Sequence, residues 1–235
     1  PGGKGDGGAL RKFLAILVCK LGRAVGKLVG KGSSMPGKFA LRICPDILAR
    51  VQLPSHIIAV TGSDGKTTTT TLISEMLKAE GKTVWLGGNI GTPLLPLTRQ
   101  MKETDLAVVE LSCFQLMDMK RSPQRAVVAN LAPNHLDIHK DMQEYIDAKR
   151  NIYLHQGGIS RTVINADNEI TASFLPEIRG EAMQFSRRIT PDLGCYLAED
   201  GTLTMNDRHS VTPVLHMDEI RIPGIHNVEN YLAAI

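Results

Sequence analysis

Short apolar runs alternate with helical patterns through most of this chain. The runs at 56–61, 83–86, 106–111, 126–130 and 162–165 have the length and composition of buried strands. Between and after them, apolar residues recur at helical spacing over 67–80, 142–154 and 226–235. Strands that alternate with helices form βαβ units. The pattern therefore predicts an α/β fold with a mostly parallel sheet and helices on both of its faces.

The two ends of the chain follow different patterns. After about residue 183 the apolar runs shorten, and Glu199-Asp200-Gly201 is typical of a hairpin turn, which predicts a small antiparallel β portion near the C-terminal end. Residues 9–29 place apolar side chains at three- and four-residue steps with Lys and Arg between them, which predicts a basic helix. The Gly/Ser/Pro-rich segment 30–37 is predicted to be a linker. We therefore divide the chain into a leader helix with its linker, residues 1–52, and a larger domain, residues 53–235.

Three interpretations of the basic helix stay open at this point. It could be a signal peptide, although its charges run through the whole segment and no clear cleavage site follows. It could lie on an anionic membrane surface. Its apolar face could instead pack on the rest of the chain or on a partner, which is the commoner arrangement for an amphipathic helix.

Composition and charge narrow the classes of protein. With 43% hydrophobic and 22% charged residues, the 235-residue chain is globular in composition, and no apolar run approaches the roughly 20 residues of a membrane-spanning helix. Residues 1–50 hold ten Lys/Arg and two Asp, a net charge of +8, whereas the remainder holds seventeen Lys/Arg and twenty-two Asp/Glu, a net charge of −5. This division argues against a nucleic-acid partner. The four cysteines lack the spacing of zinc ligands, which favours reduced thiols in a cytoplasmic protein.

The strongest chemical motif is VTGSDGKTTTT at 60–70. An apolar strand enters a glycine turn, and Gly65-Lys66-Thr67 opens a helix. Backbone N–H groups of such a loop surround a phosphate, the lysine reaches the outer phosphates, and the threonine hydroxyl can bind magnesium. The Walker pattern is incomplete, because Thr61 stands where a glycine is usual and Gly62 follows one step later. We expect a P-loop-type sheet that binds a nucleotide through Gly62, Ser63, Asp64, Gly65, Lys66, Thr67 and Thr68.

Acidic and imidazole groups could hold magnesium near this loop. Glu110 ends a predicted parallel strand, where a metal ligand beside a phosphate loop is expected. His135 and His139 are four residues apart, but the preceding proline favours a loop, and one histidine near phosphate and magnesium is more plausible than a zinc pair. Lys149 lies on a predicted helix, and the helical pattern alone favours a surface position.

Together these motifs resemble the Mur ligases, the ATP-dependent amide-forming enzymes of peptidoglycan synthesis. The matching segments are TGSDGKTTTT, GGNIGTPL, VVELSCFQL, NLAPNHLDIH, YIDAKRNI and PGIHNVENYLAAI, in the order of the family. The phrase ELSCFQLMDM is most similar to the branch that adds D-glutamate to UDP-N-acetylmuramoyl-L-alanine through an acyl phosphate. The resemblance implies that residues 53–235 are the central ATP-binding domain of such a ligase.

The resemblance also implies residue roles. Lys66, Lys149 and His135 would be catalytic; Thr67, Glu110, His135 and Lys149 would hold magnesium, with two ions and a carbamate on Lys149. Asn89 would help to place the nucleotide-sugar substrate, and Asn227 and Asn230 would contact the adenine. Two departures stand out: the family has Ser-Ser where this chain has Ser112-Cys113, and the uridine-binding and amino-acid-binding domains are not in the sequence. Since the chain begins at Pro1 and ends within a helical pattern, we expect a fragment.

Other functions remain open. The leader resembles the start of the Mur-ligase-like subunit of lipid II isoglutaminyl synthase, which would bring a glutaminase-like partner, although the four-cysteine zinc insertion of that branch is missing. A folylpolyglutamate synthase is disfavoured by ELSCFQL and NHLDIH. A non-catalytic ATP-binding module attached to a membrane is the third alternative, motivated by the basic leader.

Overall fold

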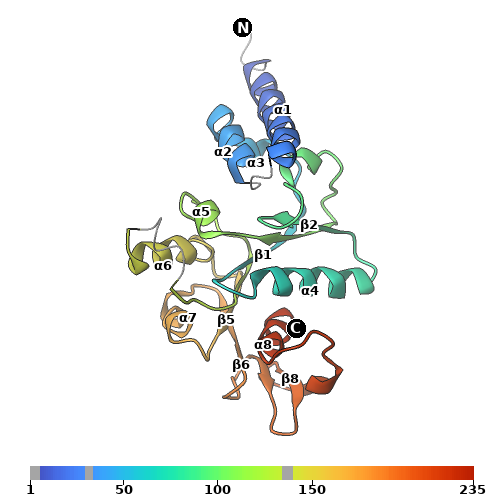
Figure 1. Cartoon of the computed structure of the whole chain (residues 1–235), viewed down its shortest axis with the longest axis vertical. Coiled ribbons are helices and arrows are strands. Elements are labelled where there is room, and N and C mark those ends of the chain that lie inside the picture. Colours follow the sequence, from blue (N-terminus) through green and yellow to red (C-terminus); the bar gives the residue numbers. More distant parts are fainter. Residues whose placement is uncertain (1–5, 30–33, 134–139) are drawn as a thin grey trace.

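The computed structural model describes residues 6–29, 34–133 and 140–235 (Figure 1). A nine-stranded sheet runs through it in the order β2-β3-β1-β4-β5-β6-β7-β8-β9. The strands are β1 (His56–Thr61), β2 (Val84–Gly88), β3 (Leu106–Glu110), β4 (Arg125–Val128), β5 (Arg161–Asn165), β6 (Glu181–Ser186), β7 (Gly194–Leu197), β8 (Thr202–Asn206) and β9 (Val211–His216). The first seven strands pair in parallel, and β8 and β9 join antiparallel. The predicted fold class, with its antiparallel portion at the C-terminal end, is confirmed.

Helices cover both faces of this sheet. They are α4 (Lys66–Ala79), α5 (Cys113–Leu116), α6 (Met142–Arg150), α7 (Glu169–Ala172) and α8 (His226–Ala234), with short 3-10 helices η1 (Leu95–Leu97), η2 (Leu175–Glu177) and η3 (Met217–Glu219). Alternate residues of a strand face opposite sides. Ala59 accordingly joins the core beneath α5, α6 and α7, and its neighbour Val60 joins the core beneath α4 and α8. Helix α6 ends at Arg150, earlier than predicted, and hydrogen-bonded turns follow it.

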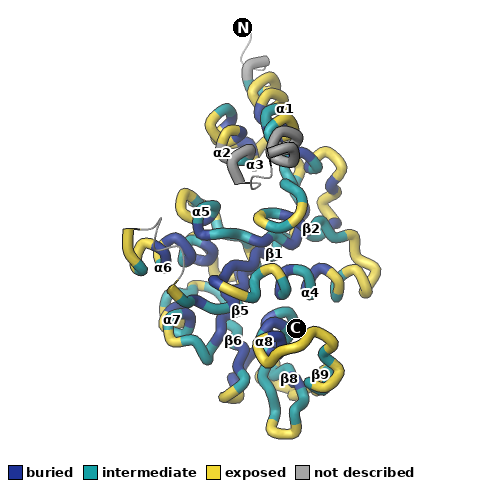
Figure 2. The backbone as a smooth tube through the Cα atoms, in the orientation of Figure 1, coloured by how far each residue is buried: buried dark blue, intermediate teal, exposed yellow. Residues whose placement is uncertain are grey.

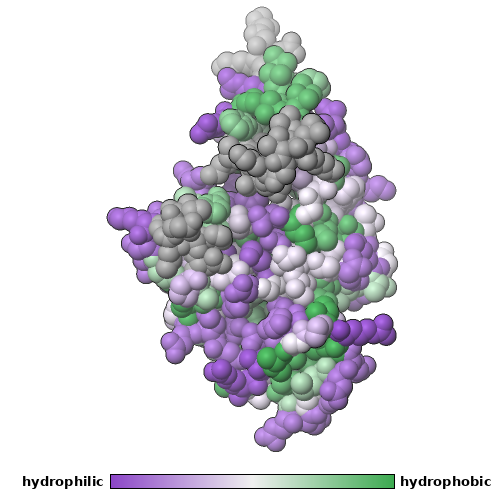
Figure 3. Space-filling model, viewed as in Figure 1, coloured by the Kyte–Doolittle hydropathy of each residue, from purple (hydrophilic) through white to green (hydrophobic). Residues whose placement is uncertain are grey.

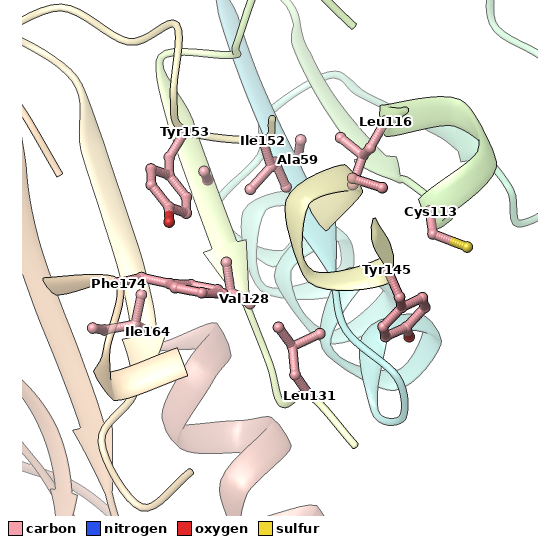
Figure 4. Packing of buried hydrophobic residues seen from close by; sticks show 12 residues of the cluster. Ala59, Cys113, Leu116, Val128, Leu131, Tyr145, Ile152, Tyr153, Ile164 and Phe174 are labelled. Atoms are coloured by element: carbon pink, nitrogen blue, oxygen red, sulfur yellow. The ribbon is translucent and has the colours of Figure 1, made fainter. Parts of the chain in front are cut away.

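The core beneath α5 and α6 lies next to the loop that follows β1. Figure 4 shows Tyr145 of α6 beside Cys113 and Leu131, with Tyr153 and Phe174 on the opposite side of the same cluster, near Ile164. Each fully buried aliphatic or aromatic side chain contributes about 1.5–3 kcal/mol to folding. This packing therefore holds α6 in a defined position against the ends of β1 and β4.

Helix α4 forms from a sequence with weak helix propensity. Its run of five threonines is β-branched and loses side-chain entropy in a helix. The hydroxyls of Thr70 and Thr71 donate to the carbonyl oxygens of Lys66 and Thr67, four residues earlier, and Thr69 and Thr70 are buried. Tertiary packing therefore stabilises the helical conformation of this segment, which local propensity alone would not favour.

The N-terminal region forms a helical unit of its own. Helix α1 (Asp6–Val29) packs on α2 (Ser34–Ile43) and α3 (Ile47–Arg50) at one end of the molecule (Figure 1). The predicted linker 30–37 is wrong in its second half, because residues 34–37 open α2. Pro36 is tolerated there, since the N–H groups of the first helical turn have no partner within the helix.

Candidate nucleotide-binding site

The loop between β1 and α4 is shaped by two crowded glycines. Gly65 has φ of 74°, a left-handed conformation that favours glycine, and a Cβ there would lie 2.2 Å from Oδ1 of Asn230. A Cβ on Gly62 would lie 3.2 Å from the Cβ of Ala129. Nζ of Lys66 donates to the carbonyl oxygen of Ser63 at 2.9 Å, so the lysine folds back over the loop. The turn points the N-terminal end of α4 toward the space beyond the carboxyl end of β1, where its N–H groups can face an anion.

The side chain of Ser63 is turned into the protein. Its Oγ accepts the N–H of Ala132 at 2.9 Å and also contacts Tyr145 Oη and the carbonyl oxygen of Ala132, both at 2.9 Å. The residue is 4% exposed. Ser63 therefore offers a ligand its backbone, while its hydroxyl ties the loop to α6 and to the segment after β4.

Three of the predicted site residues meet at the end of β3. Glu110, only 1% exposed, accepts the Thr67 hydroxyl on Oε2 at 2.7 Å and the Asn89 amide on Oε1 at 2.8 Å. Strand β3 lies beside β1 in parallel, so the carboxylate falls next to the phosphate loop. Carboxylate and hydroxyl oxygens are the ligands that magnesium prefers, and the chemistry of this donor set fits that ion.

Lys149 lies beside the same loop and not on the surface, so the position favoured by the helical pattern is wrong. The residue is 1% exposed, and its Nζ donates to the carbonyl oxygen of Gly62 at 2.7 Å and to Oγ1 of Thr61 at 3.0 Å. Nζ also lies 5.2 Å from the centre of the Tyr145 ring. Burial lowers the pKa of Lys149 to about 8, because desolvation disfavours the charged ammonium group.

Two asparagines of α8 close the other side of the loop. The Nδ2 of Asn230 donates to Oδ1 of Asn227 at 2.9 Å, and Oδ1 of Asn230 accepts the Thr69 hydroxyl at 3.3 Å. Both asparagines are buried. Beside them is a pocket of about 90 Å³, lined by Asp64, Gly65, Ala129, Asn130, Phe185, His226, Glu229 and Asn230. The predicted adenine residues therefore adjoin the predicted phosphate loop.

The remaining predicted residues are either less buried or outside the described part of the chain. Asp64 is exposed and its N–H donates to Oδ1 of Asn130 at 3.0 Å, while Thr68 lies half-buried in the first turn of α4. His135 and His139 lie outside the described residues. Within the described ranges, no group of three or more His, Cys, Asp and Glu residues could hold a metal ion.

Sequence reasoning missed three residues at this site. Thr61 binds Nζ of Lys149, Tyr145 binds Ser63, and Asn130 holds the loop through both its carbonyl and its side chain. A signal existed for two of them. Tyr145 precedes Lys149 by four residues and so shares its helix face. Asn130 lies two residues after the end of β4, the parallel neighbour of β1, so it is expected near the loop that follows β1.

The parallel sheet and the glycine loop between its first strand and α4 define a P-loop-type α/β protein. Residues 60–235 match the family described as the Mur ligase middle domain, and the chain belongs to this family. The predicted resemblance to the Mur ligases is therefore confirmed.

Curated relatives agree with the branch that the motifs favoured. The chain is 52% identical over 181 residues to a protein of Ruminiclostridium cellulolyticum named UDP-N-acetylmuramoylalanine–D-glutamate ligase. It is equally similar, at 52%, to the protein of the same name from Acetivibrio thermocellus. Each match covers 77% of this chain and 39% of the relative, so the chain spans about two fifths of the length of these relatives.

Solved structures of other Mur ligases share the fold. A UDP-N-acetylmuramoyl-L-alanyl-D-glutamate–2,6-diaminopimelate ligase has a TM-score of 0.62 at 24% identity, over 83% of this chain and 45% of that structure. A UDP-N-acetylmuramoylalanyl-D-glutamyl-2,6-diaminopimelate–D-alanyl-D-alanyl ligase from Acinetobacter baumannii has a TM-score of 0.60 at 19% identity, over 84% and 45%. The family match begins at residue 60, so the leader lies outside it, and nothing in the comparisons supports a glutaminase-like partner. Separately, none of the helices in the described part of the chain is long and apolar enough to cross a bilayer.

Proposed function

We propose that this chain is the ATP-binding part of an ADP-forming ligase that joins D-glutamate to UDP-N-acetylmuramoyl-L-alanine. The observation that carries the proposal is the convergence of Lys66, Thr67, Glu110 and Lys149 on one loop, in a chain 52% identical to ligases of that name. Residues 53–235 would form the central domain and residues 1–52 an added leader, in a cytoplasmic enzyme.

The proposed reaction has two steps. An oxygen of the substrate carboxylate attacks the γ-phosphorus of ATP, the bond to the β-phosphate oxygen breaks, and an acyl phosphate and ADP result. The amine of D-glutamate then attacks the acyl carbon, phosphate leaves, the nitrogen loses a proton and an amide remains. The repulsion between carboxylate and triphosphate opposes the first step, so the protein must position both groups and neutralise their charge.

The chain's own groups can supply much of this positioning. The N–H groups of residues 62–67 and the ammonium of Lys66 would hold the phosphates, and Asn227 and Asn230 would border the adenine. Thr67 and Glu110, with His135 and a modified Lys149, would hold magnesium, expected as two ions. When bound, the metal supplies positive charge next to the transferring phosphate. Asn89 fixes one oxygen of Glu110 and would lie near the nucleotide sugar.

Lys149 is proposed to carry a carbamate. Its lowered pKa, about 8, gives a larger neutral fraction near pH 7 than an exposed lysine has. The neutral Nζ attacks the carbon of carbon dioxide, an N–C bond forms, and one proton leaves to solvent. The product is an anionic oxygen ligand where the unmodified side chain is a cation. Carbon-13 NMR of the protein under ¹³C-labelled bicarbonate should show a carbamate resonance that Lys149→Arg abolishes.

Nucleotide binding tests the site directly. We expect the chain to bind magnesium–ATP weakly, and Lys66→Ala to lower the affinity at least tenfold. Lys78→Ala is the matched control, because Lys78 lies in the last turn of the same helix and pairs with Glu75 at the surface. Equal losses in both variants would contradict the assignment of Lys66.

Substrate choice needs a separate measurement. Phosphate release from ATP should depend on UDP-N-acetylmuramoyl-L-alanine when this region is part of a chain as long as its relatives. Release that follows a different muramoyl nucleotide, with ATP binding intact, would overturn the substrate and leave the nucleotide site standing. We expect negligible ligation by the 235-residue chain, and robust turnover would contradict this.

A further inference from the structure

Helix α1 has two opposed apolar faces. One face packs on α2 and α3 and buries Ala15, Ile16 and Cys19 to 5% exposure or less. The other is exposed to solvent and is called here the outer stripe; its members are Leu10, Phe13, Leu14, Leu17 and Leu21, which are 38–59% exposed. The packing of the N-terminal unit therefore does not account for these five apolar side chains.

The outer stripe is continuous. At 100° per residue, its five side chains fall within an arc of about 100°, the width of a typical buried helix face. Figure 3 shows apolar side chains gathered over the outer part of α1, and Figure 2 shows the same part as exposed. Of the sixteen exposed large apolar side chains in the described residues, eight precede residue 51. Scattered exposed leucines are ordinary, but such a concentration marks an interaction surface.

The charges beside the outer stripe indicate which kind of partner it would bind. Exposed Arg11 and Lys20 border it on either side, about 100° and 80° from its centre. Between Asp6 and Asp46 the sequence has no acidic residue. Pairing of two copies through this stripe would bring basic residues together, because α1 holds five Lys/Arg and one acidic residue, Asp6. An anionic partner has the complementary charge.

We propose that the outer stripe binds the surface of an anionic lipid bilayer. Leucine and phenylalanine side chains would enter the headgroup–acyl boundary, and the flanking Arg11 and Lys20 would extend toward the lipid phosphates. The helix would lie in the plane of the interface, because no described helix is apolar enough to span a bilayer. In Figure 1, α1 stands at one end of the long axis of the molecule, so attachment there leaves the phosphate loop accessible.

Co-sedimentation with lipid vesicles tests the proposal on the complete 235-residue chain. We expect binding to vesicles of phosphatidylglycerol and phosphatidylcholine in a 3:7 ratio, and little binding to phosphatidylcholine alone. Phe13→Ser with Leu21→Ser should lower the partition coefficient about 100-fold, because two large apolar side chains no longer enter the interface. The matched control is Val211→Ser with Val214→Ser, two exposed apolar residues of the edge strand β9.

A charge variant distinguishes binding to anionic lipid from nonspecific hydrophobic adsorption. Lys20→Gln should lower the partition coefficient about five-fold, the contribution of one basic residue near an anionic surface. The same change at Lys82, an exposed lysine in the turn after α4, should have no effect. Circular dichroism must show that each variant keeps its helix content.

Three outcomes would overturn the proposal. The first is no binding to the anionic vesicles. The second is an equal loss for the stripe variant and its β9 control. The third is a concentration-dependent dimer in sedimentation equilibrium that the stripe variant abolishes, which would assign the surface to a second copy. None of them bears on ATP binding, so this inference and the proposed function can fail separately.

Discussion

The ammonium nitrogen of Lys149 lies 2.7 Å from the carbonyl oxygen of Gly62, which joins helix α6 to the phosphate loop through a fully buried cation. Desolvation is the largest cause of its lowered pKa, and the positive charge of Lys66 adds to it. The nearby Cys113 and Glu110 act in the opposite direction. The lysine therefore couples the protonation of one side chain to the stability of the site.

Lys149 should make folding more stable as the pH rises. Its pKa is about 8 in the folded chain against 10.5 for a solvated lysine side chain, so between these values the unfolded chain binds more protons. Relative to Lys149→Met, the free energy of unfolding should rise by about 2 kcal/mol between pH 7.5 and 9.5. Urea unfolding of both proteins at the two pH values measures this difference, and groups common to both proteins cancel. A difference that is flat with pH would show that the folded-state pKa is not lowered.

Gly65 and Gly81 form a matched pair that separates backbone strain from crowding. Both have positive φ, 74° and 77°, so alanine at either position costs about 1–2 kcal/mol of strain. Only at Gly65 does the added Cβ meet a neighbour, Oδ1 of Asn230, and that side chain is fixed by hydrogen bonds to Asn227 and Thr69. Gly65→Ala should therefore destabilise the chain and weaken ATP binding well beyond Gly81→Ala.

A double variant completes this prediction. Asn230→Ala removes the obstructing atom, so Gly65→Ala should cost less stability in that background than alone. Thermal unfolding of the two single variants and the double variant gives the coupling energy. Strictly additive effects would show that the two residues are not in contact.

The fold could be read from the sequence because it depends on local patterns. The apolar runs at β1, β3 and β4 lie where they were predicted, since buried parallel strands are almost uninterrupted in their hydrophobicity. The position of Lys149 could not be read in this way. A lysine on a helix is usually solvated, and only the packing of Tyr145 and Ala148 beside the loop takes this one out of water.

The direction in which a side chain points could not be predicted from the sequence either. The motif places Ser63 among phosphate-binding residues, yet its hydroxyl faces Ala132 and Tyr145, which are far away in the sequence. The segment 34–37 has a linker composition, but it opens α2 because Ala40 and Cys44 of that region bury an apolar face against α1. In both cases a tertiary contact determines the structure, and the local sequence does not contain that information.

Ser63 and Ser74 are both buried serines, and they should respond differently to alanine. Ser63→Ala leaves the N–H of Ala132 and the hydroxyl of Tyr145 without this partner, which should cost about 2–3 kcal/mol. The Oγ of Ser74 is buried and has no hydrogen-bond partner among the described residues, so Ser74→Ala should be neutral or stabilising. Tyr145→Phe removes the hydroxyl that contacts Ser63 but leaves the bonds between Ser63 and Ala132, and it should cost about 1 kcal/mol. Urea unfolding midpoints rank the three variants, and a larger loss for Ser74→Ala than for Ser63→Ala would contradict the hydrogen-bond account.

Glu110→Gln should change how ATP binding depends on magnesium. The buried carboxylate accepts from Thr67 and Asn89, and glutamine keeps its size but loses one negative charge and part of its acceptor capacity. With magnesium present, the affinity for ATP should fall about tenfold, a loss of ~1.4 kcal/mol. With the metal chelated, the affinity should stay equal or rise, because a negative charge that repels the triphosphate is gone. Titration calorimetry in both conditions measures the effect, with Glu103→Gln as the control at an exposed carboxylate. A loss of the same size with and without magnesium would mean that Glu110 supports the loop alone and has no part in holding the ion.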